Sequence, residues 1–133
     1  MIILDTSVLI DSLTGLKRSG EALRAVVDRH ELLAVPTLVL YEWLRGPRTP
    51  AELSNQEALF PAASALVFGQ REAELSAKLY RSVTRPRARE IDLAIAATAI
   101  LREAELWTQN AADFADIPCL RLFTPPKASS PRP

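Results

Sequence analysis

Four acidic residues, widely separated along the chain, stand where chemistry could be carried out. Asp5 directly follows an apolar run at the start of the chain, and Asp92 begins a nearly continuous apolar segment. Carboxylates gathered in one place need a cation to balance them, and oxygen ligands without His or Cys favour Mg²⁺ or Mn²⁺ over zinc. Such a metal suits phosphoryl chemistry, because it polarises a phosphate and lowers the pKa of a bound water. The four candidate ligands are Asp5, Glu42, Asp92 and Asp113.

The elements that must position these acids follow from the apolar pattern of the sequence. Strands are expected over 2–4, 32–35, 64–68, 106–108 and 119–123, and helices over 8–13, 19–29, 37–45, 50–60, 70–83 and 91–103. Short apolar strands alternating with helices predict a parallel sheet covered on both faces, a three-layer α/β/α sandwich. We expect one domain over 1–125 and a flexible Pro/Ser-rich tail over 126–133.

This arrangement would bring the four acids to one edge of the sheet, since functional groups of parallel α/β folds gather beyond the carboxyl ends of the strands. Asp5 follows the first strand, and Glu42 lies about a turn and a half into the helix after the second. Asp113 follows the strand 106–108 through the loop 109–112. Asp92 begins a helix that is apolar nearly all round, where a charge is costly unless it is paired or bound to a metal.

Each acid also has an ordinary structural role, which the sequence leaves open. Asp5 could cap the helix that follows it, and Asp92 could favour the dipole of its own helix. Glu42 could pair with Arg45 at i+3, and Asp113 could be an ordinary loop aspartate. Four such coincidences at one sheet edge are much less probable than any one of them, so we interpret the set as a site.

Composition excludes some classes of function. Sixteen basic and sixteen acidic residues give no net charge, which counts against a passive binder of duplex DNA but allows a local basic rim. None of the four glycines belongs to a phosphate-binding loop. Cys119 is expected to be a buried thiol without a disulfide, and His30 a surface residue. No apolar run could span a membrane and no signal peptide is recognisable, so we expect a cytoplasmic protein without a membrane partner.

Four segments resemble, in order and spacing, the four blocks of PIN-domain ribonucleases, most closely the VapC-type toxins of toxin–antitoxin pairs. They are DTSVLID, YEWLRG, DLAIAATAI and TQNAADF. The resemblance extends from residue 2 to about 125 and implies a parallel-sheet α/β/α sandwich. It also implies Mg²⁺-dependent or Mn²⁺-dependent endonucleolytic cleavage of RNA, usually tRNA or rRNA. The partners it implies are a second copy of the chain, as a homodimer, and a cognate VapB-like antitoxin that covers the active-site groove.

The same resemblance assigns roles to individual residues. Asp5, Glu42 and Asp92 match the three core acids of the family, and Asp113 matches the fourth. Thr6 matches the hydroxyl residue beside the first acid, although it could simply cap a helix. Asn110, where some relatives carry an acid, matches a polar residue that would orient water or substrate, although it could be a turn residue.

Two surfaces of the chain allow two interpretations each. The loop before the third block carries Arg85, Arg87 and Arg89, whereas many relatives have a largely uncharged loop there. These arginines could contact RNA phosphates or form a solvated loop. Leu38, Tyr41 and Leu44, with Trp43 beside Glu42, form an apolar stripe that could belong to the core or to a partner groove.

Two other functions compete with the ribonuclease. The first is a catalytically weak PIN-fold partner of a DNA-binding antitoxin in a repressor complex, but the presence of an acid in all four blocks favours the enzyme. The second is a phosphohydrolase with Asp5 as the nucleophile. Such enzymes need a second acid two residues later, where this chain has Ser7, and a lysine for which Lys78 and Lys127 are poor candidates.

Overall fold

The computed structural model of the protein describes residues 1–126, so the predicted tail lies almost entirely outside the described residues. In the described part, four parallel strands form one sheet in the order β2-β1-β3-β4. The strands are β1 (Ile2–Leu4), β2 (Leu33–Ala34), β3 (Glu105–Trp107) and β4 (Arg121–Leu122). The predicted parallel α/β class is confirmed.

The central strand β1 explains why the first apolar run does not alternate. All three of its residues are buried, because both faces of a parallel sheet are covered by other elements. Leu4 pairs with Trp107 of β3, and Ile3 pairs with Ala34 of β2. This register places the residues that follow β1 and β3 side by side at the same edge of the sheet.

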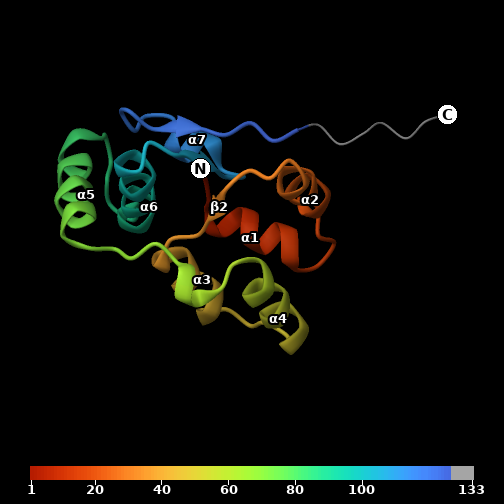
Figure 1. Cartoon of the computed structure of the whole chain (residues 1–133). Helices are drawn as coiled ribbons and strands as arrows, with labels where there is room; N and C mark the ends of the chain where they lie inside the picture. The colour runs from red at the N-terminus through yellow and green to blue at the C-terminus, as the bar shows by residue number, and fades with distance from the viewer. Residues whose placement is uncertain (127–133) are drawn as a thin grey trace.

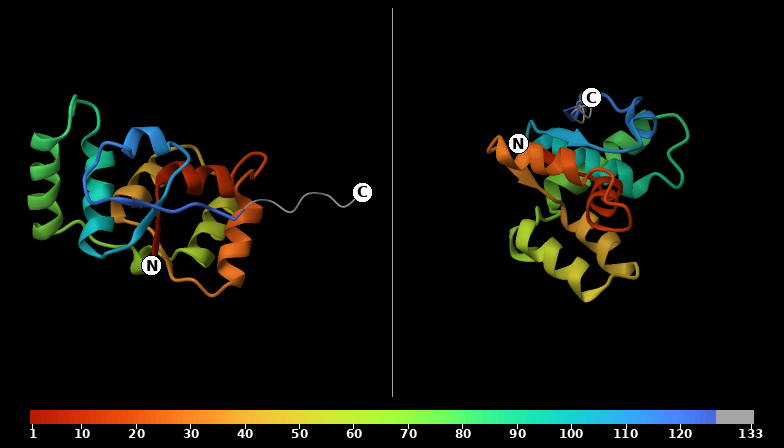
Figure 2. Two further views of the ribbon diagram at one scale, coloured as in Figure 1. Left: turned by 90° about the horizontal axis from the view of Figure 1, so that it is seen from above. Right: turned by 90° about the vertical axis from the view of Figure 1, so that its right-hand side faces the viewer.

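The helices pack around the sheet, with α5 and α6 on one side of the molecule and α1 and α2 on the other (Figures 1 and 2). Helix α6 contacts α5, α3 and β3, and α1 contacts α2, α3 and α4. The helices of the described residues are α1 (Thr6–Leu13), α2 (Gly20–Asp28), α3 (Thr37–Arg45), α4 (Pro50–Leu59), α5 (Gln70–Ser82), α6 (Glu90–Leu101) and α7 (Ala111–Phe114). None of them is long and apolar enough to cross a membrane.

Helix α6 is the buried helix that the sequence predicts. Seven consecutive residues, from Leu93 to Ala99, are buried. The one hydroxyl among them, on Thr98, donates to the carbonyl oxygen of Ala94 at 2.9 Å, so its burial leaves no unpaired donor. Because its alanines have small side chains, α6 can lie close to its neighbours, and this brings its first turn, with Asp92, to the edge of the sheet.

Three local predictions are wrong. Instead of a strand, the segment 64–68 contains the last residue of a short 3₁₀ helix (Ala62–Ser64) and one isolated bridge, between Leu66 and Pro36. The bridge is made by the Leu66 N–H, which donates to the Val35 carbonyl oxygen, and by the Thr37 N–H, which donates to the Leu66 carbonyl oxygen. Helix α3 begins at Thr37, so the extended chain that could pair with 64–68 ends there. Cys119 is exposed, in a turn with a φ of 67°, instead of buried. The predicted loop 109–112 is shorter, because α7 already begins at Ala111.

Candidate active site

Asp5 is fixed at the end of β1 by the turn that starts α1. It is the N-cap of that helix, and its Oδ1 accepts hydrogen bonds from the Ser7 N–H at 2.5 Å and from the Ser7 hydroxyl at 2.7 Å. The side chain is buried, and Oδ2 accepts no hydrogen bond from the described residues. The capping role that the sequence allowed is therefore real, but it occupies one oxygen and leaves the other available.

Ser7 is a residue of this site that the sequence reasoning missed. Besides donating to Asp5, its hydroxyl accepts a hydrogen bond from the backbone N–H of Gln109 at 3.0 Å. The Gln109 side chain in turn donates to the hydroxyl of Ser19 at 2.5 Å. Ser7 thus connects the end of β1 to the segment after β3, a link between distant parts of the chain that no local pattern could indicate.

Glu42 reaches the same edge from the middle of α3. The Thr6 hydroxyl donates to its Oε1 at 2.5 Å, which joins the start of α1 directly to α3. Arg45 approaches Oε2 at 3.4 Å, so the predicted i+3 pair is present. The Arg45 side chain is 54% exposed, so solvent screens the charges and this ion pair contributes little to stability. Thr6 therefore contacts an acid of the set, and its hydroxyl positions Glu42.

Asp92 carries the clearest sign that the four acids lie together. Burial of its carboxyl, followed by the negative charges of Asp5, Glu42 and Asp113, raises its pKa from 3.8 to about 6. The positive charge of Arg89 acts in the opposite direction but is outweighed. Electrostatic influence of this kind requires proximity. The other three acids that the sequence singled out therefore lie within electrostatic range of Asp92, in the first turn of α6.

Asp113 lies on the short helix α7, whose backbone is held by Arg89. The Arg89 guanidinium donates to the main-chain oxygen of Asp113 at 2.9 Å. It also donates to both carboxylate oxygens of Asp116, at 2.5 and 3.0 Å. Asp116 raises the pKa of Arg89, and Arg89 lowers the pKa of Asp116. Asp116 had no distinguishing signal in the sequence, because its partner lies 27 residues away.

The remaining predicted site residues differ in what they contact. Asn110 is exposed and occupies the N-cap position of α7, where its side chain makes no capping hydrogen bond. Arg85 and Arg87 are exposed. Arg89 instead directs its guanidinium to protein acceptors, and its side chain is only 19% exposed. Of the three loop arginines, Arg85 and Arg87 are thus exposed to solvent, and Arg89 has a structural partner.

The donor set suits a divalent cation with a preference for oxygen. The Asp92 carboxylate accepts no hydrogen bond from residues 1–126, and its nearest charged neighbours are mostly negative, so a cation would satisfy it. Within the same range, no three acidic, His or Cys side chains already lie close enough to share one ion. The carboxylate side chains would therefore have to rotate to coordinate one ion together. His30 is exposed and is not among the groups that shift the pKa of Asp92.

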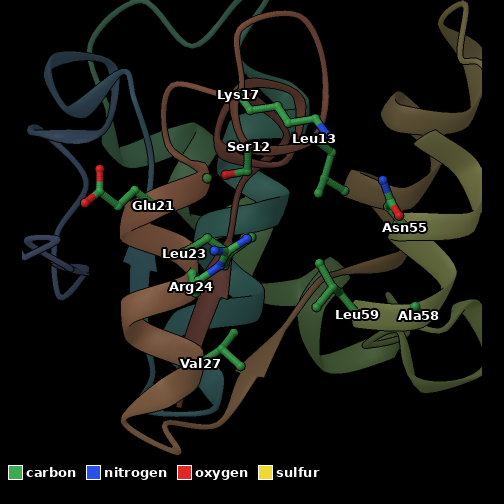
Figure 3. Close-up of a pocket in the computed structure, with 11 residues that line it drawn as sticks. Ser12, Leu13, Lys17, Glu21, Leu23, Arg24, Val27, Asn55, Ala58 and Leu59 are labelled. Atoms are coloured by element: carbon green, nitrogen blue, oxygen red, sulfur yellow. The ribbon is translucent and has the colours of Figure 1, made fainter. Parts of the chain in front are cut away.

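A separate hollow of the described surface lies away from these acids. A cavity of about 720 Å³ opens between α1, α2 and α4, lined mainly by apolar side chains. Figure 3 shows Val27 of α2 and Leu59 of α4 pointing toward one another across it. None of the four acids lines this cavity. The cavity therefore lies apart from the four acids, which belong to the carboxyl edge of the sheet.

Comparison with known proteins agrees with this architecture. The model of the PIN domain family matches residues 2–118. The chain belongs to the PIN-domain family. It is 33% identical over 124 residues to Ribonuclease VapC19 of Mycobacterium tuberculosis, strains CDC 1551 / Oshkosh and H37Rv, a match that covers 91% of this chain and 98% of the relative. The family resemblance drawn from the four sequence blocks is confirmed.

Solved structures of the same fold are also similar. The structure of DNA-bound VapBC from Salmonella typhimurium aligns with a TM-score of 0.77 at 21% identity, covering 92% of this chain and 96% of that chain. The toxin–antitoxin complex from Klebsiella pneumoniae aligns with a TM-score of 0.68 at 26% identity, covering 90% of this chain and 95% of that chain. The fold of this PIN-domain chain is therefore that of the matched chain in each of these structures.

Proposed function

We propose that this PIN-domain protein is a Mg²⁺-dependent endoribonuclease and the toxin of a type II toxin–antitoxin pair. The observation that carries the proposal is the raised pKa of Asp92, which has Asp5, Glu42 and Asp113 among its causes. A cluster of carboxylates at the carboxyl edge of a parallel sheet is the ligand set that a catalytic Mg²⁺ or Mn²⁺ requires. The similarity to a protein named ribonuclease over nearly the whole chain supports the same activity.

In this proposal each acid has a distinct task. Asp5, with one oxygen held by Ser7, and Asp92, which has no hydrogen-bond donor among the described residues, would be the principal ligands. Glu42, held by Thr6, and Asp113 would complete the shell and accept hydrogen bonds from the attacking water. The bound ion would neutralise charge on the scissile phosphodiester and make that water more acidic. Asn110 lies on the same short segment as Asp113 and would orient water or substrate.

The RNA would be held chiefly by charge at the rim of the site. Arg85 and Arg87 are exposed at the loop that precedes α6, the helix that carries Asp92 in its first turn. Each phosphate contact would make binding depend on salt concentration. We propose tRNA or rRNA as the substrate class. Sequencing of RNA ends after induced expression would identify the cleaved molecule and the position of the cut.

The decisive test is cleavage of RNA by the purified protein with Mg²⁺ and with EDTA. Asp5→Asn should abolish cleavage while keeping the fold, because the amide cannot supply a charged ligand oxygen. Asp28→Asn, an exposed acid at the end of α2, is the matched control and should cleave like the wild type. If Asp5→Asn cut RNA as fast as the wild type, or if EDTA had no effect, the proposal would be wrong.

The partners follow from the same family. We propose that a VapB-like antitoxin binds this chain, because the similar solved structures include toxin–antitoxin complexes. From the family resemblance alone, we also propose a homodimer that acts in the cytoplasm. The apolar stripe on α3 supports a partner surface only in part. Trp43 is fully buried in the core, whereas Tyr41 is 55% exposed and Leu44 is 52% exposed. Co-purification with the product of the neighbouring gene, followed by light scattering, would give the partner and the stoichiometry.

A further inference from the structure

Helix α7 carries one of the four acids but has little of its own to hold it in place. It has only four residues, from Ala111 to Phe114, and a helix of one turn is unstable by itself. Phe114 is its single buried side chain. Asp113 is exposed. The position of Asp113 relative to Asp92 must therefore depend on contacts made by other elements.

Arg89 and Asp116 supply those contacts. Arg89 is the N-cap residue of α6, three residues before Asp92, and Asp116 lies two residues beyond the end of α7. The guanidinium holds both carboxylate oxygens of Asp116 in the two-point geometry that fixes distance and orientation together. The same group donates to the main-chain oxygens of Asp113 at 2.9 Å and of Thr84 at 3.2 Å. The Arg89 side chain thus connects both α7 and the loop before α6 to the first residues of α6.

We propose that Arg89 and Asp116 act as a positioning pair that holds Asp113 against the Asp92 end of the site and thereby sets the affinity of the site for a divalent metal. This inference rests on the proposed function, because it assumes that the four acids bind such an ion. Arg89 is neither a ligand nor an RNA contact in this role. It acts only through the backbone that carries Asp113.

Positioning and electrostatics predict opposite effects of Arg89→Met on metal affinity, so this substitution can distinguish between them. A guanidinium near Asp92 and Asp113 repels a cation, so removing its charge in Arg89→Met should strengthen metal binding if electrostatics decides. If positioning decides, the same substitution should weaken binding, because α7 loses its tether. We expect Mn²⁺ affinity to fall about 10-fold, the lower end of the effect of supporting residues at metal sites.

The experiment is calorimetric titration of the purified full chain with Mn²⁺ alone, without RNA. Asp116→Asn should weaken binding as Arg89→Met does, and Arg89→Lys, which keeps the charge but loses the two-point geometry, should give an intermediate loss. Arg81→Met, at an exposed position near the end of α5, is the control and should change Mn²⁺ affinity less than about 2-fold. Circular dichroism in EDTA establishes that each variant is folded.

A double-mutant cycle separates this role from a general loss of structure. In an Asp113→Asn background, Arg89→Met should have almost no further effect on Mn²⁺ affinity, because the residue it positions has already lost its charge. Unchanged or tighter Mn²⁺ binding by Arg89→Met, or full additivity with Asp113→Asn, would overturn the inference and leave the proposed function standing. A wild-type chain that bound no Mn²⁺ would instead overturn both.

Discussion

The pKa of Asp92 leads to a prediction about stability that is independent of any RNA. This pKa is raised from 3.8 to about 6 by burial and by the charges of Asp5, Glu42 and Asp113, so the fold favours the protonated carboxyl. In the absence of metal, this group contributes most to stability below about pH 4. Its contribution declines as the pH rises from about 4 to 6 and stays lost above that range.

The magnitude follows from the size of the rise. A pKa change of this size corresponds to about 3 kcal/mol between the two protonation states. Because Asp92 is only half-buried, solvent screening reduces the expected effect to ~1–2 kcal/mol. Asp92→Asn resembles the protonated acid, so at pH 7.5 in EDTA it should be more stable than the wild type by this amount. For a domain of this size the melting temperature should rise by about 4–8 °C.

The assay is thermal unfolding in EDTA, followed by circular dichroism from pH 4 to pH 8. Other carboxylates also titrate, so the quantity to compare is the difference between Asp92→Asn and the wild type at each pH. That difference should be near zero at pH 4 and reach its full value by about pH 7. Asp28→Asn, an exposed acid outside the cluster, should stay within about 0.5 kcal/mol of the wild type throughout.

One result would refute this reasoning directly. If Asp92→Asn lowered stability at pH 7.5, or differed from the wild type by the same amount at every pH, Asp92 would not be destabilised by its acidic neighbours. A further arm adds Mg²⁺ at pH 7.5. The ion should stabilise the wild type, since binding to the folded state alone shifts the equilibrium, and should stabilise Asp92→Asn much less.

Three further substitutions, one of them with an exposed control, test other parts of the structure. Trp43→Ala, which empties a fully buried position, should reduce the free energy of unfolding in urea by about 3–5 kcal/mol, whereas the exposed Tyr41→Ala should change it by less than about 1 kcal/mol. Thr49→Ala removes the side chain that caps α4 and should cost about 1 kcal/mol in the same measurement. Ser7→Ala removes the hydroxyl that donates to Asp5 Oδ1 and leaves only the backbone N–H bond to that oxygen, so it should lower Mn²⁺ affinity in calorimetry by about 10-fold, and an unchanged affinity would show that this hydroxyl does not orient the acid.

The errors of sequence-based prediction in this chain share one physical cause. The segment 64–68 has a strand-like composition but forms only one bridge, because the chain it pairs with turns into helix α3 at Thr37. Cys119 lies in an apolar stretch but is exposed, because it occupies a turn with positive φ. In both cases the segment is apolar, as its composition shows, but its neighbours in the fold decide its secondary structure and its exposure to solvent.

The sequence by itself determined the class of the fold and the identity of the acids. Apolar runs that do not alternate require a sheet covered on both faces, and the carboxyl ends of parallel strands meet at one edge, so the positions of Asp5 and the other three acids along the chain were enough to choose them. Only the tertiary structure decided what holds them. The contacts of Ser7 with Gln109, of Thr6 with Glu42 and of Arg89 with Asp116 join residues 27 to 102 positions apart. Such pairs leave no periodic trace along the chain, because their partners become neighbours only when the sheet and the helices have packed.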